Sequence, residues 1–170
     1  MPRLFTALEI PRDAALSLSL LRGGLPGARW IDVENYHITL RFIGDVEGHM
    51  ADEIANALDR VRRPEFMLNL SGVDAFGSKK PHSIYAGVSP SPGLNALQAE
   101  IERICQRLRL PADPRKFTPH VTLARLKKCP HRGCGALSFR AGKLRHAALQ
   151  GRAVRLDVVA RFGRRRPLYR

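Results

Sequence analysis

Two stretches of the chain are nearly alike: HITLRFIG at residues 37–44 and HVTLARLK at residues 120–127. Each begins His-x-Thr-Leu, with a branched apolar residue between the His and the Thr. The chain contains six His and four Thr among 170 residues, so random placement predicts only about 0.14 His-x-Thr triplets. Two copies are therefore more than chance supplies, and we take the repeat as the feature that organises the fold.

The spacing inside each motif determines where its side chains point. On a strand, residues two apart share a face and lie about 6.6–6.8 Å apart along it. His37 and Thr39 are expected to share one face of a strand, and His120 and Thr122 one face of another. The apolar residues between them face the other way, where helices can cover them. If two such strands lie face to face or side by side, they form a cleft that contains two imidazoles and two hydroxyls.

This set of side chains suits chemistry at a phosphodiester. Such a reaction needs a base that takes a proton from the attacking oxygen and an acid that gives one to the leaving oxygen. Histidine, with an ordinary pKa near 6.5, can do either, and each role contributes about 10²–10⁴-fold. Threonine hydroxyls and nearby cations can hold the non-bridging oxygens. No metal is required, and the symmetry of the set does not decide which His is the acid.

The hydrophobic pattern predicts an α+β chain forming a single domain over residues 1–170. We expect two pseudo-symmetric lobes, each an antiparallel sheet backed by helices, with a cleft between them. Residues 127–150 have poor periodicity and are predicted to form a long loop. Strands are predicted at residues 3–10, twice within 28–44, and at 65–77, 82–88, 116–127 and 152–162. Helices are predicted at residues 12–23, 45–61 and 91–110.

Charge and cysteine usage limit the partners and the compartment. Lys and Arg number 29 against 15 Asp and Glu, a net charge of +14, which favours a polyanion such as RNA; the alternative is an Arg-rich surface without a partner. There is no apolar run long enough for a membrane span and no signal-peptide pattern. The absence of a membrane span and of a signal-peptide pattern, together with an odd number of cysteines, three, predicts a cytoplasmic protein.

We expect a monomer. The tract CPHRGC at residues 129–134 lacks a second ligand pair, so no metal is expected.

At this point the residues resemble a known family. NYHITLRFIG at residues 35–44 and TPHVTLARL at residues 118–126 look like the two signature motifs of the 2H phosphoesterases. Within that superfamily the chain looks most like the RNA 2′,3′-cyclic phosphodiesterases, also described as 2′-5′ RNA ligase-like proteins. The first strand, Trp30 and the closing Tyr169 also fit, and Tyr169 is taken as a substrate-binding candidate. The resemblance implies a metal-independent enzyme without a cofactor. Its substrates would be RNA with 2′,3′-cyclic phosphate ends or small cyclic nucleotides, hydrolysed to a 2′-phosphate.

The resemblance also assigns roles to the motif residues. It implies that His37 donates a proton to the leaving 3′ oxygen and that His120 accepts one from water. It implies that Thr39 and Thr122 hold the phosphate. Arg125 matches a substrate-contacting Arg of the family, although strict alternation puts it on the opposite face from His120 unless the strand bends or bulges.

Other side chains are weaker candidates for the cleft. By alternation Arg41 shares the face of His37 and is expected to be a second phosphate-binding cation; the alternative is a solvated strand residue. Tyr36, Trp30 and Phe42 could stack on a base, but alternation predicts a core position for Phe42. Two other functions stay open: ligation through a 2′-5′ bond by the reverse reaction, and an RNA-binding module without catalysis.

Overall fold

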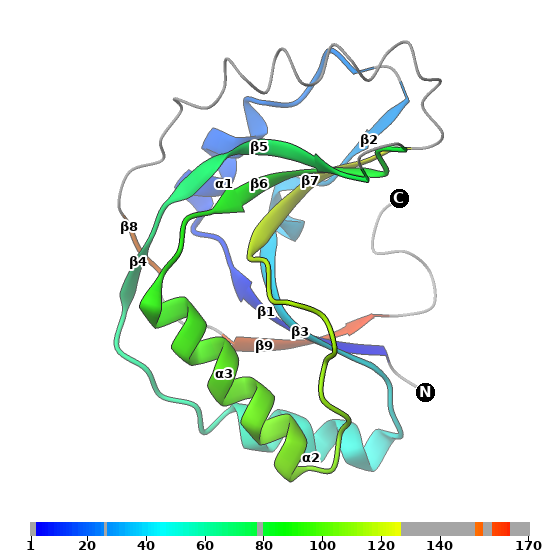
Figure 1. The fold of residues 1–170 in the computed structure, drawn as a ribbon, viewed down its shortest axis with the longest axis vertical. Coiled ribbons are helices and arrows are strands. Elements are labelled where there is room, and N and C mark those ends of the chain that lie inside the picture. The colour runs from blue at the N-terminus through cyan, green and yellow to red at the C-terminus, as the bar shows by residue number, and fades with distance from the viewer. Residues whose placement is uncertain (1–2, 26, 78–79, 127–151, 155–157, 164–170) are drawn as a thin grey trace.

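The computed structural model describes residues 3–25, 27–77, 80–126, 152–154 and 158–163, and confirms an α+β fold built on antiparallel strands (Figure 1). The strands are β1 (Arg3–Glu9), β2 (Ala28–Trp30), β3 (His37–Asp45), β4 (Phe66–Leu68), β5 (Leu70–Phe76), β6 (Ser83–Val88), β7 (His120–Leu126), β8 (Arg152–Val154) and β9 (Val158–Gly163). The helices are α1 (Arg12–Ser19), α2 (Gly48–Leu58) and α3 (Pro92–Arg107), with a 3₁₀ turn η1 (Val33–Asn35). Among the described residues, none of the helices is both long and apolar enough to cross a membrane.

The predicted elements are present in the predicted order, with two differences. The strand expected over residues 65–77 is divided into β4 and β5, and the one expected over 152–162 is divided into β8 and β9. The reason is the same in both cases, because β4 and β8 leave the main sheet and pair with each other in a separate two-stranded sheet. The loop predicted at residues 127–150 lies outside the described residues.

The main sheet has the strand order β5-β6-β7-β3-β1-β9, with β2 pairing on β7. Its two halves, β5-β6-β7 and β3-β1-β9, meet where Ile38 of β3 lies opposite Val121 of β7. In Figure 1 the first half lies above the second, and β3 and β7 meet at the centre. This meeting point lies inside both His-x-Thr motifs. The two separate lobes stay a prediction, since the seven strands of the main sheet are continuous across the point where its halves meet.

The two halves of the sheet repeat one pairing pattern. In each half the motif strand pairs antiparallel with an inner neighbour, β3 with β1 and β7 with β6. The partners occur in equivalent positions along the two neighbours. The matched pairs are His37–Glu9 with His120–Gly87, Thr39–Ala7 with Thr122–Tyr85, Arg41–Thr6 with Ala124–Ile84, and Phe42–Phe5 with Arg125–Ser83.

Both motif strands contain a bulge directly after the Thr. The register passes over Leu40 in β3 and over Leu123 in β7, so each strand has one residue more than its neighbour there. An extra residue reverses the alternation of faces beyond it. The burial pattern agrees, because both strands have two consecutive buried residues at this point and then an exposed one. Residues five positions after each His therefore lie on the same face as that His.

The buried apolar residues of both motif strands belong to the core cluster that also contains residues of helices α2 and α3, and α3 lies directly against β3. Ile38 and Leu40 are buried in one cluster with Ile54 of α2 and with Leu97 and Ile101 of α3. Helix α3 begins as predicted, because the Ser91 hydroxyl accepts a hydrogen bond from the backbone N–H of Leu94 and Pro92 occupies the first turn. With one face covered, the His and Thr side chains lie on the opposite face of the sheet.

Candidate active site

The two motif histidines are held in the same way. Nδ1 of His37 lies 2.7 Å from the carbonyl oxygen of Asn35, and Nδ1 of His120 lies 2.7 Å from that of Thr118. A carbonyl oxygen only accepts, so each Nδ1 carries the proton and donates it. In the neutral ring this leaves the lone pair on Nε2. Each imidazole is thus fixed in orientation by the residue two before it, with Nε2 as the nitrogen for chemistry.

The single pair between β3 and β7 gives an expected arrangement of the four polar motif residues. Continuing the antiparallel register of Ile38 and Val121 by one residue in each direction puts His37 beside Thr122 and Thr39 beside His120. The two histidines are then diagonal neighbours, whose Cβ atoms are about 7–8 Å apart. That spacing leaves room for one phosphate group between the imidazoles. His37, Thr39, His120 and Thr122 are all half-buried, as expected for side chains lining a cleft.

The imidazole of His120 sits against two aromatic rings. Its centroid lies 4.7 Å from that of Phe76 and 5.4 Å from that of Tyr85, both edge-on, and the Phe76 and Tyr85 rings stack at 4.0 Å. Burial lowers the pKa of His120 below 6.5, and the positive charge of Arg125 lowers it further, against the opposing effect of the hydrogen bond to Thr118. His120 is therefore neutral near pH 7, with the Nε2 lone pair available. This is the state that a general base needs.

The bulge decides the positions of the two candidate arginines. Arg125 is exposed and lies opposite Ser83, on the face of His120 and Thr122, which answers the objection from alternation. Arg41 was expected on the motif face, and that expectation was wrong. Its side chain is 3% exposed, because the extra residue Leu40 turns it to the covered face.

Arg41 instead connects β3 to helix α3. Its guanidinium forms an ion pair with Glu102 of α3 and donates to the carbonyl of Pro111. Its Nε is buried without a hydrogen-bond partner among the described residues. Arg41 is consequently a structural residue and is removed from the set of phosphate-binding candidates.

The aromatic side chains are also redistributed by the bulge. Phe42, expected in the core, is 51% exposed on the motif face, 6.0 Å from the ring of Phe5, and the guanidinium of Arg115 lies 5.1 Å above it. Tyr36, considered for base stacking, is 2% exposed and belongs to the core. Trp30 is partly buried against the core. Tyr169 lies outside the described residues, so its role stays a prediction.

Sequence reasoning missed the residues that surround the motif histidines from neighbouring strands. Phe5 lies 5.3 Å from the ring of His37, while Phe76 and Tyr85 surround His120. Glu9 lies opposite His37 in the register. The sequence predicted the strands RLFTALE and SIYAGV, which contain Phe5, Glu9 and Tyr85. It did not predict which residues of these strands lie beside each histidine, because that depends on the register between strands.

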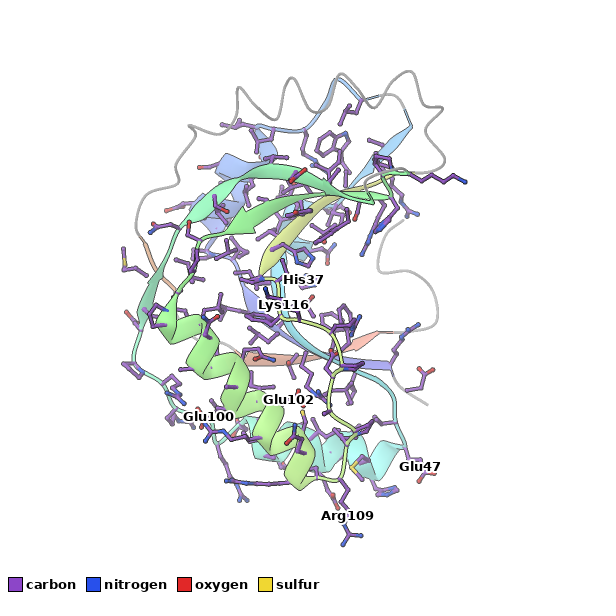
Figure 2. The ribbon with its side chains drawn as sticks, in the orientation of Figure 1. His37, Glu47, Glu100, Glu102, Arg109 and Lys116 are labelled. Carbon is purple, nitrogen blue, oxygen red and sulfur yellow. The ribbon has the colours of Figure 1, made fainter. Side chains whose placement is uncertain are left out.

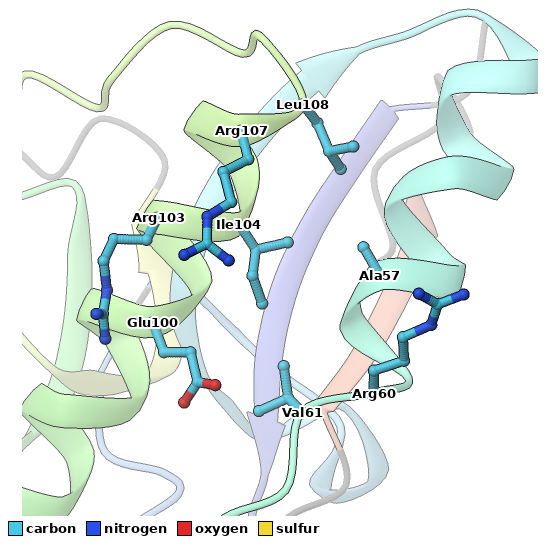
Figure 3. A pocket seen from close by; sticks show the side chains of 8 residues that line it. All are labelled: Ala57, Arg60, Val61, Glu100, Arg103, Ile104, Arg107 and Leu108. Atoms are coloured by element: carbon cyan, nitrogen blue, oxygen red, sulfur yellow. The ribbon is translucent and has the colours of Figure 1, made fainter.

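The motif residues are separate from a pocket on the helical side of the sheet. In Figure 2 the side chain of His37 lies near the centre of the molecule, whereas Glu100 and Glu102 project from α3. A pocket of about 390 Å³ lies between α2 and α3 and is lined mainly by arginines and aliphatic side chains (Figure 3). These helices lie on the side of the sheet opposite the motif residues, so the pocket is not the place for the His chemistry.

The part of the chain that the structure describes contains no cluster of three His, Cys, Asp or Glu that could hold a metal; residues 129–134 lie outside it.

The chain is similar to known phosphoesterases in sequence and in fold. The family model for LigT-like phosphoesterases matches residues 8–85 and 87–169. An RNA 2′,3′-cyclic phosphodiesterase of Aeropyrum pernix is 38% identical over 120 residues, covering 69% of this chain and 68% of that protein. A protein of the same name from Geobacillus stearothermophilus is 33% identical over 128 residues, covering 71% of this chain and 41% of that protein. The crystal structure of E. coli LigT complexed with 3′-AMP has a TM-score of 0.63 and 25% identity, covering 76% of this chain and 77% of that one.

The buried ion pair gives a prediction about stability. Replacing Arg41 by Met should lower the free energy of unfolding by about 3 kcal/mol, because Glu102 loses its partner in a largely buried setting. The matched variant Arg125→Met removes an exposed charge and should change it by no more than about 0.5 kcal/mol. Urea unfolding followed by circular dichroism measures both. A loss below about 1 kcal/mol in Arg41→Met would contradict the structural role.

The environment of His120 gives a prediction about pH. By NMR, its imidazole should titrate below pH 6.5, and Arg125→Met should move the midpoint upward without restoring it fully, since burial remains. The unfolded chain then binds the proton more tightly, so the free energy of unfolding should fall as the pH drops from about 6.5 through the lowered pKa. A midpoint at or above 6.5 for His120 would show that the ring is not buried as described.

Proposed function

The chain belongs to the LigT-like phosphoesterase family, and from this premise we propose that it hydrolyses 2′,3′-cyclic phosphate ends to 2′-phosphates. The substrate class is RNA with such ends, or small cyclic nucleotides. His37 and His120 carry the reaction as acid and base without a metal ion. One observation supports the proposal: Ile38 and Val121, the middle residues of the two His-x-Thr motifs, lie opposite each other in neighbouring antiparallel strands.

The reaction begins at His120. Its Nε2 lone pair takes a proton from a water molecule, whose oxygen attacks the phosphorus. The bond between phosphorus and the 3′ oxygen breaks, and the leaving oxygen takes the proton from Nε2 of His37. The product has a 2′-phosphate and a free 3′-hydroxyl. His37 is left neutral and His120 charged, and exchange with solvent restores the starting protonation states.

The diagonal arrangement of the histidines suits this displacement. The attacking and leaving oxygens lie on opposite sides of the phosphorus, so the base and the acid must also stand on opposite sides. Thr39 and Thr122 occupy the other diagonal, from which their hydroxyls can donate to the non-bridging oxygens. Arg125, on the same face, adds a positive charge where negative charge accumulates. Each group thus has a role set by its place in the register.

Substrate class and cellular setting are proposed from charge and from cysteine chemistry. The net charge of +14 favours a polyanion over an isolated nucleotide, because each phosphate contact adds counterion release. A protein with buried, reduced Cys105 fits the cytoplasm, and we propose a monomer there. Ligation through a 2′-5′ bond uses the same two imidazoles in reverse, but water outcompetes a second RNA end.

The proposed function is tested by activity on a nucleoside 2′,3′-cyclic phosphate in excess chelator. His37→Ala and His120→Ala should each lower kcat/KM by about 10²–10⁴-fold, since each removes a proton-transfer group. His49→Ala, at an exposed position on α2, is the matched control and should leave it unchanged. Binding of RNA should survive all three substitutions, because charge carries it.

Three results would contradict the proposal. Full turnover in either motif variant would remove the acid–base pair. Loss of wild-type turnover in chelator, restored by a divalent metal, would replace it by metal catalysis. Binding of RNA without any turnover would favour the RNA-binding module.

A further inference from the structure

The repeated register shows where the two halves of the site differ. Opposite His37 stands Glu9, and opposite His120, at the equivalent position, stands Gly87. We propose that Glu9 is a positioning residue that keeps His37 in its charged form and thereby sets it as the acid of the reaction. This inference rests on the proposed function and deepens it, because neither motif by itself distinguishes acid from base.

The geometry puts the Glu9 carboxylate on the correct face. Glu9 is the half-buried last residue of β1, directly opposite His37. Side chains directly opposite one another in an antiparallel pair share a face, with Cβ atoms about 4.5–5.5 Å apart. Phe5, four residues earlier on the same strand and beyond the register shift, contacts the His37 ring at 5.3 Å between centroids. Two positions of β1 thus flank one imidazole on the motif face.

A carboxylate on that face beside the ring would favour the charged imidazole, because opposite charges within about 4–6 Å stabilise each other. The His120 half offers the reverse environment. A Cβ atom at Gly87 would lie 2.7 Å from the hydroxyl oxygen of Ser71, so that position does not accept a side chain without rearrangement. His120 instead has Arg125 on its face and aromatic rings beside it. One histidine faces a negative charge and the other a positive one.

Other charged residues near His37 do not supply the same effect. Lys116 lies on the segment that leads into β7 and is positive. Arg115, above Phe42, is paired with Asp113 at 2.9 Å. Glu9 is the acidic residue whose register position is directly opposite His37. Its charge is therefore the one that opposes the surrounding cations.

The test compares Glu9→Gln with Glu9→Asp and with Glu53→Gln, which removes an exposed carboxylate from α2. NMR follows the titration of the His37 and His120 rings, and kcat/KM for a nucleoside 2′,3′-cyclic phosphate is measured against pH. In Glu9→Gln the midpoint of the His37 titration and the alkaline limb of the kcat/KM profile should both move about one pH unit lower. The acid limb of that profile, set by His120, should stay in place. Glu9→Asp and Glu53→Gln should behave as wild type.

Each other outcome overturns the inference. The inference is wrong if, in Glu9→Gln, the His37 titration midpoint and both limbs of the kcat/KM profile stay within about 0.2 pH units of wild type. The carboxylate would then not act on the ring. Equal shifts in Glu9→Gln and Glu9→Asp would assign the effect to packing. Failure of the proposed function is a different result, namely full turnover in His37→Ala. Even with that result, NMR titration of His37 in the wild type and in Glu9→Gln shows whether Glu9 acts on the ring.

Discussion

The site depends on one contact between two strands, the antiparallel pairing of Ile38 and Val121. Both side chains are fully buried, so the covering helices hold the pairing in place from one face. The residues before and after each of them are thereby forced onto the other face. A slip of one residue would exchange the faces and bury the imidazoles among aliphatic side chains. The hydrophobic core therefore sets the position of the catalytic candidates.

The bulge that both motif strands share also determines which side chains lie on the motif face. By inserting Leu40 and Leu123, the strands place Phe42 and Arg125 on the motif face and send Arg41 into the interior. At the position after the bulge one half of the sheet thus presents Phe42 and the other Arg125, although the motifs are nearly identical. A symmetric scaffold with unequal contents suits a reaction in which one imidazole gives a proton and the other takes one. The asymmetry comes partly from the motif strands, through Phe42 and Arg125, and partly from the neighbouring strands, through Glu9 and Gly87.

Much of this could be predicted from the sequence. The paired motifs predicted one shared face for His37 and Thr39 and one for His120 and Thr122, and hydrophobic periodicity predicted the order of the elements. Arg41 and Phe42 were misplaced because strict alternation was assumed through Thr-Leu, where the extra residue is invisible without the partner strand. Arg125 was assigned by resemblance and its face was explained only by the bulge. Glu9, Phe76 and Tyr85 were missed because a contact across a sheet depends on register, which periodicity does not encode.

The most direct measurement of the central claim is the crystal structure of the protein with a nucleoside 2′-phosphate. The account predicts one phosphate between the imidazoles, with Nε2 of His37 and Nε2 of His120 both within hydrogen-bond reach of its oxygens, about 2.6–3.2 Å. The Thr39 and Thr122 hydroxyls should contact the same phosphate. A phosphate held by only one imidazole, or bound between α2 and α3 with the motif face empty, would contradict it.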